Sequence, residues 1–230
     1  IRGNGFGSTR GASRVLFGTT EADYNFPTAC LQSVWSDGQV IVKVPAGIAN
    51  GNYNINMEIG SWDIQSSSQF TVDAAAPLMP SLCKISPNRG PANANVSLWG
   101  EYFGNIGQSV TSRFYNQQDT DGIISDDNNA NRLNVLVPAQ AVTGPVAVLK
   151  NNAPGNGLNF VVGACTNNNQ CDPGSPVCCP FGSPNQGQCV AGMMDPQNGC
   201  YSNIPNSVFE WTFGTSLAVA CDSDPNTPAC

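Results

Sequence analysis

The chain of 230 residues contains no histidine, and this absence excludes several kinds of functional site. Serine–histidine–aspartate and cysteine–histidine catalysis are impossible within it, and so are histidine-ligated zinc, haem and copper sites. Pairs of carboxylates remain the main catalytic option, but no pair suited to glycoside hydrolysis can be picked out. We therefore expect neither an enzyme nor a cofactor.

Charge and long apolar runs are also scarce. Charged residues make up 11% of the chain, and the formal net charge is −7. Because there is no run of basic residues, nucleic acid and anionic membranes are poor partners. No apolar stretch is long enough to cross a bilayer. The sequence also lacks an initiator methionine and a signal peptide, which predicts a processed product or a fragment.

The Cys-x-x-Cys spacing typical of zinc-binding arms is missing too, although the chain has ten cysteines. Their number predicts disulfides in an oxidising compartment, and hence an extracellular or cell-surface protein. The ten are Cys30, Cys83, Cys165, Cys171, Cys178, Cys179, Cys189, Cys200, Cys221 and Cys230. Six of them fall between residues 165 and 200, in a segment too polar to fold without covalent bridges. The pairing stays open, and a Cys83–Cys165 bridge is one option.

What the chain does have is an internal repeat. Three motifs occur twice in the same order: Gly3–Gly7 and Gly100–Gly104, Val44–Ala46 and Val137–Ala139, and Phe70–Val72 and Phe160–Val162. A phenylalanine follows each glycine motif at the same spacing, at Phe17 and Phe114. A period of roughly 90–97 residues is one small domain long, so it predicts tandem domains.

Frequent glycine (24) and proline (17) favour turn-rich β-structure, and no segment has a helical period. Residues 52–59 alternate strictly between polar and apolar types, which predicts a strand with one face toward a core. That face carries Tyr53, Ile55, Met57 and Ile59. A second apolar run, Val40–Val44, predicts another strand, which ends at Pro45.

The second copy carries a recognisable set of motifs. Ile85-Ser86-Pro87 is followed by Gly90, then by Val96-Ser97-Leu98-Trp99-Gly100 with Phe103-Gly104, then by Phe114 and Val135–Pro138. This pattern resembles the IPT/TIG family, over residues 81–163 well and over residues 1–72 in part. The resemblance implies immunoglobulin-like β-sandwiches of a bacterial cell-surface or extracellular protein. It does not identify a ligand, because sandwiches host many functions.

These patterns together predict an all-β chain of tandem immunoglobulin-like sandwiches with a small disulfide-rich segment. The first sandwich spans residues 1–76 and lacks its opening strand, because Ile1-Arg2-Gly3 aligns with Leu98-Trp99-Gly100 and leaves no counterpart of residues 81–97. The second sandwich spans residues 77–163. A disulfide-rich spacer (164–205) and a C-terminal strand and tail (206–230) follow, and that strand resembles the closing strand of other bacterial immunoglobulin-like domains.

Three patterns could indicate ligand sites. The glycine motif Gly3–Gly7 could bind phosphate, but no helix follows it, so we expect a bulged turn with Phe6 packed inward. Asp119, Asp121, Asp126 and Asp127 have a carboxylate density suited to calcium, although a solvated loop between strands is the favoured interpretation. The four tryptophans could form a sugar-stacking face or lie in the core. They are Trp35, Trp62, Trp99 and Trp211.

The predicted function is structural or adhesive rather than catalytic. A sandwich that lacks a strand exposes a hydrophobic groove. The alternating residues 208–213 could fill that groove in the next subunit and so build a filament by β-strand addition. The contact residues would be Val208, Phe209, Trp211 and Phe213. A homo-polymer, other surface proteins and a glycan are the candidate partners.

Two interpretations compete with the filament. The chain could be a fragment of a longer protein whose neighbouring residues supply the missing strand. It could also be a carbohydrate- or protein-binding module of a larger secreted protein or enzyme, and an exposed row of aromatic side chains on one sheet would favour that alternative.

Overall fold

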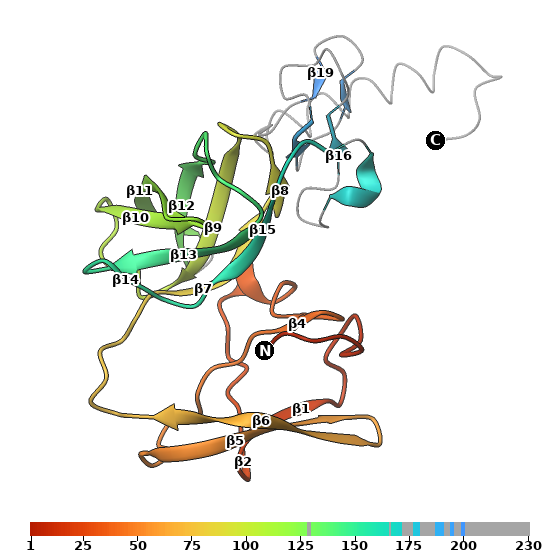
Figure 1. Cartoon of the computed structure of the whole chain (residues 1–230), viewed down its shortest axis with the longest axis vertical. Helices are drawn as coiled ribbons and strands as arrows, with labels where there is room; N and C mark the ends of the chain where they lie inside the picture. The colour runs from red at the N-terminus through yellow and green to blue at the C-terminus, as the bar shows by residue number, and fades with distance from the viewer. Residues whose placement is uncertain are drawn as a thin grey trace, which may run out of the picture. The chain divides into compact units, whose positions relative to one another are not determined.

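The computed structural model of the chain describes residues 1–127, 130–165, 167–171, 177–179, 187–190, 194–195 and 199–200. Two compact units divide the chain, and each is treated by itself. The first unit comprises Ile1–Ser86 with Ala92–Val162, and the second comprises Pro87–Pro91 with Gly163–Cys230. The described elements are strands and two short 3-10 helices, so the predicted all-β fold is confirmed (Figure 1). None of the described helices is long and apolar enough to span a membrane.

The first repeat (residues 1–76) has a four-stranded antiparallel sheet in the order β2-β1-β5-β6. Its bounds are Arg14–Phe17 for β1, Thr20–Glu21 for β2, Gly51–Ile59 for β5 and Trp62–Val72 for β6. A hairpin of β3 (Trp35–Ser36) and β4 (Gln39–Val40) and the 3-10 helix η1 (Thr28–Cys30) complete it. Phe6, Val15, Phe17, Trp35, Val40 and Met57 form its core. The predicted core face of residues 52–59 is confirmed, because Met57 is buried and Tyr53, Ile55 and Ile59 pack against the same cluster.

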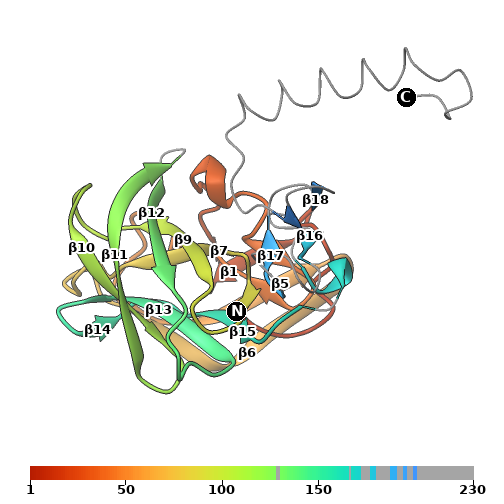
Figure 2. The same ribbon diagram turned by 90° about the horizontal axis from the view of Figure 1, so that it is seen from above.

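The second repeat contributes residues 77–86 and 92–162 to the first unit. Its strands are β7 (Ser81–Ser86), β9 (Asn95–Glu101), β10 (Ser109–Phe114), β11 (Gln118–Asp127), β12 (Ala130–Leu136), β13 (Gly144–Lys150), β14 (Ala153–Pro154) and β15 (Leu158–Val162). They follow the order β7-β9-β12-β11-β10-β13-β15, with β14 beside β13, and Figure 2 shows β10, β11 and β12 side by side. Apolar and polar residues alternate in β9, where Val96 and Leu98 are buried in the core and Ser97 between them is only partly buried.

The two repeats make the same contacts at equivalent positions. Phe17 meets Phe70 edge to face with ring centroids 5.4 Å apart, and Phe114 meets Phe160 in the same way at 5.5 Å. Arg2 and Gln39 form an isolated antiparallel β-bridge. This bridge is the counterpart of the pairing between Trp99 and Arg132 in the second repeat. The first repeat therefore keeps the end of the strand that β9 forms in the second.

The glycine motif holds a phenylalanine against the backbone of its first glycine. A Cβ atom on Gly3 would lie 2.5 Å from the Phe6 ring, and one on Gly100 would lie 2.7 Å from the Phe103 ring. Both rings are buried. The predicted inward turn of Phe6 is thus confirmed, and the glycine is required because the ring occupies the space of a side chain.

The second unit contains short paired strands and disulfides. β16 (Val177–Cys178) pairs with β17 (Cys189–Val190), and β18 (Met194–Asp195) pairs with β19 (Gly199–Cys200). The unit also holds β8 (Arg89–Gly90) and the 3-10 helix η2 (Asn168–Gln170). Disulfides join Cys165 to Cys178 and Cys171 to Cys189, and Cys179 is disulfide-bonded as well. The predicted disulfide-rich segment is therefore confirmed.

Two local expectations are wrong. The aspartate-rich stretch is not a loop, because residues 118–127 form β11, which pairs with β10 on one side and β12 on the other. The run Val40–Val44 is not one strand either. Only Val40 belongs to β4, while Lys43 makes an isolated bridge to Asp23. In β11, pairing with the two adjacent strands outweighs local composition.

Candidate functional site

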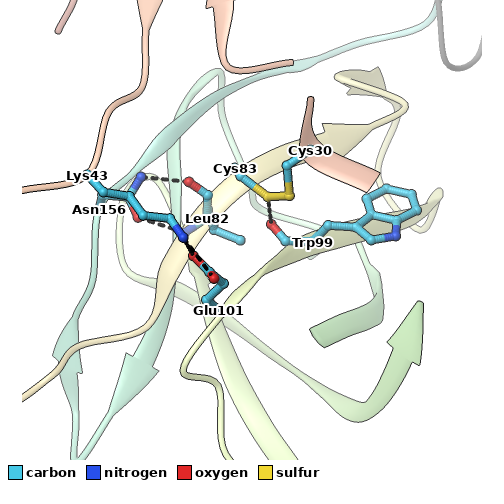
Figure 3. The surroundings of a disulfide bond; sticks show 7 residues. All are labelled: Cys30, Lys43, Leu82, Cys83, Trp99, Glu101 and Asn156. Carbon is cyan, nitrogen blue, oxygen red and sulfur yellow. Dashed lines mark hydrogen bonds and ion pairs between the residues drawn. A yellow bond between two sulfur atoms is a disulfide. The ribbon is translucent and has the colours of Figure 1, made fainter. Parts of the chain in front are cut away.

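A disulfide ties the two repeats of the first unit together. It joins Cys30, the last residue of η1, to Cys83 in β7, across 53 positions of sequence. Figure 3 shows this disulfide with Trp99 beside it. Both cysteines are buried, and the apolar side chains around them come from both repeats. These are Phe26, Ala29, Val34 and Trp99. We call this disulfide and its apolar surroundings the clasp. Because Cys83 pairs with Cys30, the Cys83–Cys165 bridge that the sequence allowed does not form.

An ion pair lies beside the disulfide in Figure 3. Lys43 of the first repeat places its Nζ 2.7 Å from Oε2 of Glu101 in β9, and it donates a hydrogen bond to Oε1 at 3.0 Å. The two side chains are only 26% and 24% exposed. Lys43 also lies 5.1 Å from the centre of the Phe26 ring. Partial burial makes such a pair stronger than an ion pair at the open surface.

An asparagine side chain holds β7 beside the clasp. The Nδ2 of Asn156 donates to the carbonyl of Leu82 at 2.8 Å, and its Oδ1 accepts from the Leu82 amide at 2.7 Å. The amide of Asn156 thus makes the two hydrogen bonds that a neighbouring strand would make, as Figure 3 shows. This contact fixes the strand that carries Cys83.

Further contacts join the repeats around the clasp. Arg2 donates from Nη2 to the carbonyl of Gly157 at 3.1 Å, and Ile41 packs against the core of the second repeat. On the second repeat, the Lys84 ammonium lies 4.5 Å from the centre of the Trp99 ring. A covalent bond, an ion pair and apolar contacts therefore act on the same interface between the repeats.

The strand β6 is a second candidate site. It ends the sheet of the first repeat, so within the described residues it has a hydrogen-bonded neighbour strand on one side only. Trp62, Ile64 and Phe70 are 73%, 51% and 44% exposed on it. We call these three side chains the β6 apolar row. An edge strand of this kind can accept another strand.

The third feature is a polar pocket of about 420 Å³ on the second repeat. It is lined mainly by Ser109, Thr111, Asp119, Lys150, Asn151 and Asn152. Arg113 holds Asp119 by two hydrogen bonds, from Nε to Oδ1 at 2.7 Å and from Nη2 to Oδ2 at 2.8 Å. These bonds lower the pKa of Asp119.

The predicted calcium residues do not converge in the part of the chain that the structure describes. Asp119 is paired with Arg113, Asp121 accepts a hydrogen bond from Thr111, and Asp126 is exposed on β11. The side chain of Asp127 lies outside the described residues. The one group of three ligand-type atoms found among the described residues consists of Cys165, Cys171 and Cys189, and all three are in disulfides.

The tryptophans do not form one sugar-stacking face. Trp35 lies in the core of the first repeat and donates from Nε1 to the Phe6 carbonyl at 3.0 Å. Trp99 packs at the clasp, and Trp62 is exposed on β6. Trp211 lies outside the described residues, as do Val208, Phe209, Phe213, Cys221 and Cys230, and so does the side chain of Cys200.

Sequence reasoning missed the clasp and the β6 apolar row. Cys30 and Cys83 stand apart from the six clustered cysteines, which is a weak signal that they pair with each other. The row leaves almost no signal, because polar residues fill the middle of β6 between Ile64 and Phe70.

Comparison with known proteins gives one family match. Residues 1–73 match the model of the IPT/TIG domain, which is the repeat that resembled the family only in part by its motifs. No curated protein matches the chain.

Two solved structures show only distant likeness. The full extracellular region of plexin A4 is 14% identical with a TM-score of 0.28, and the match covers 66% of this chain and 13% of that one. The Bacteroides ovatus protein SGBP-B of the mixed-linkage glucan utilization locus, solved with a mixed-linkage heptasaccharide, is 17% identical with a TM-score of 0.23. That match covers 75% of this chain and 43% of that one. The chain thus spans less than half the length of either structure. The comparisons identify an IPT/TIG domain at residues 1–73, within a chain whose described part is almost entirely β-structure.

Proposed function

We propose that this protein is a non-enzymatic structural or adhesive protein of the bacterial cell surface, with tandem IPT/TIG-like domains and a disulfide-rich spacer. In this proposal it is a subunit of a filament assembled by β-strand addition. The observation that carries the proposal is the clasp, which ties the two repeats covalently where a flexible linker would ordinarily leave two domains independent.

The clasp suits a protein that bears mechanical load. When the chain is pulled from its two ends, tension passes from Cys30 directly to Cys83 through the disulfide. The residues between them carry no tension, and they include β5 and β6. The ion pair of Lys43 and Glu101 and the apolar contacts at the clasp resist separation of the repeats at the same place. The disulfides also favour an oxidising, extracellular location.

Single-molecule force spectroscopy on the full chain tests this function. The Cys30→Ala/Cys83→Ala variant is compared with the wild type, with the other disulfides left oxidised. Because the bond spans 53 positions and each freed residue adds roughly 3.4 Å, the fully extended variant should be longer by about 18 nm. Equal extended lengths of the variant and the wild type would show that the disulfide does not bypass this segment. That result would contradict the load-bearing role.

A second function, a carbohydrate-binding module, is supported by the 73% exposure of Trp62 on a sheet edge. Binding to a glycan array by the wild type, and its loss in Trp62→Ala, would favour this alternative. Equal binding by the wild type and by Trp62→Ala would contradict it.

A further inference from the structure

We infer that the free edge of β6 and the β6 apolar row are an acceptor site for a β-strand from a second copy of this chain, and that residues 208–213 are the strand that binds there. This inference rests on the proposed function, because it names the site and the partner segment through which subunits would join.

The edge strand β6 lacks most of the features that prevent edge strands from pairing with another chain. Natural edge strands are commonly blocked by lysine, by proline or by being very short. β6 has eleven residues, Trp62–Val72, and contains neither lysine nor proline. Asp63 is its one charged residue. A register shift between Asn54 and Asn56 of β5 divides the pairing of β5 with β6 into two stretches. Phe70 lies in one stretch, and Trp62 and Ile64 lie in the other.

The apolar row faces the core side of the sheet although it is exposed. Trp62 pairs with Ile59, Ile64 with Met57, and Phe70 with Tyr53 across the two strands. Directly paired residues point to the same face of a sheet. Met57, Ile59 and Tyr53 belong to the core cluster of the first repeat, so the row is the uncovered margin of that core.

The second repeat shows what covers the equivalent place. Phe160 on β15 is the counterpart of Phe70, and it is 1% exposed instead of 44%. There β7 contacts both β15 and β13. β7 covers this place without joining the edge of β15, because its hydrogen-bonded partner is β9. Among the described residues of the first repeat, β5 is the one strand hydrogen-bonded to β6. The row on β6 is therefore uncovered within the described part of the chain.

Residues 208–213 have the alternating pattern of a strand that would cover the row. The segment Val208–Phe213 has six residues. Its alternate positions Phe209, Trp211 and Phe213 are all aromatic. In a strand these three side chains point to one face, where they would cover the apolar row, while Glu210 would point away from it.

The test compares polymer formation by full-length variants. The acceptor variant is Trp62→Ser/Ile64→Ser, the donor variant is Trp211→Ser/Phe213→Ser, and the control is Ile106→Ser, which removes another exposed apolar side chain that is 66% exposed. The wild type and the control should form polymers, as seen by electron microscopy and analytical ultracentrifugation. Each of the other variants should need at least about tenfold more protein to do so, because central aromatic anchors dominate such contacts.

Mixing the two defective variants sharpens the result. The acceptor variant keeps its donor strand, and the donor variant keeps its acceptor edge, so a mixture can form one intact junction for each pair of molecules. The expected product is a heterodimer and not a filament. Circular dichroism and thermal unfolding of each variant show whether its sandwiches remain folded.

Several outcomes would overturn the inference, and they separate it from the proposed function. Polymers of unchanged length in both variants would contradict the β6 acceptor site but would still support filament formation. A monomeric wild type, in which only the donor variant binds a synthetic peptide of residues 208–213, would show that each molecule fills its own groove. Binding of a glycan at Trp62 without any self-association would assign the row to a carbohydrate.

Discussion

Phe70 and Phe160 occupy the same position in the two repeats, and each meets its partner phenylalanine edge to face. Their surroundings differ, because Phe160 is enclosed by its repeat while Phe70 lies at an uncovered margin. The residue type and the motif are therefore the same, and burial decides how much each side chain contributes to stability.

Replacing these residues separately should show this difference. Phe160→Ala should lower the free energy of unfolding by about 3–5 kcal/mol, because it empties a closed core. Phe70→Ala should cost about 1–2 kcal/mol, because half of its surface already contacts water. Urea unfolding of the two variants measures both values. Equal losses would contradict the open margin of the first repeat.

Asp119 gives a prediction about pH. Hydrogen bonds from Arg113 lower its pKa in the folded protein, and the unfolded chain lacks these bonds. The interaction therefore stabilises the fold at pH values above the ordinary pKa of an aspartate, and this stabilisation is lost as the pH falls through the lowered value. In a carbon-13 NMR titration, Arg113→Gln should raise the pKa of Asp119.

The matched control for that titration is Arg10→Gln, which removes the same charge from the first repeat, where Arg10 pairs with Glu21. Its effect on the pKa of Asp119 should be negligible because of the screening of distant surface charges. A pKa that stays the same in Arg113→Gln would refute the role of the ion pair.

Strands differ in how well the sequence predicts them. β5 was predictable because Tyr53, Ile55, Met57 and Ile59 alternate strictly, and one side of the sheet is buried. β11 was predicted as a loop because aspartate and asparagine favour turns. Pairing with β12 nevertheless extends it to Asp127, with Ile124 buried next to the exposed Ile123. Local composition describes a segment well only where pairing with neighbouring strands does not override it.

The clasp could not be predicted in the same way. Neither Cys30 nor Cys83 lies in a periodic pattern, and their pairing depends on how η1 and β7 meet in space. The partners Lys43 and Glu101 give no signal either, because they belong to different repeats. The six clustered cysteines did predict the disulfide-rich segment, but not which residues pair.

Removing the clasp should destabilise the protein more than removing a shorter bridge. The chain-entropy estimate for a closed loop of 53 positions is about 4 kcal/mol, so Cys30→Ala/Cys83→Ala should lower the free energy of unfolding by about that amount. For Cys165→Ala/Cys178→Ala, with a separation of 13, the estimate is about 3 kcal/mol. Urea denaturation under non-reducing conditions measures both. If Cys30→Ala/Cys83→Ala unfolded at the same urea concentration as the wild type, the prediction would be contradicted.

The chain carries a net charge of −7, which would oppose the proposed association of copies. Like-charged subunits repel each other, and salt screens this repulsion. We therefore expect polymers to form at lower protein concentration as sodium chloride rises from about 0.02 M to about 0.5 M, where the screening length falls to a few ångströms. Light scattering at a series of salt concentrations measures this dependence. Polymers that dissolve as salt rises would instead indicate that ion pairs hold the subunits together.

The bond between Cys30 and Cys83 also changes the outcome of proteolysis. A single cut in the backbone anywhere between these two residues leaves both pieces covalently attached. Such nicked molecules would migrate as one band on a non-reducing gel and as two bands after reduction. Damage to the turns between β3 and β6 would therefore not release either half of the protein from the other.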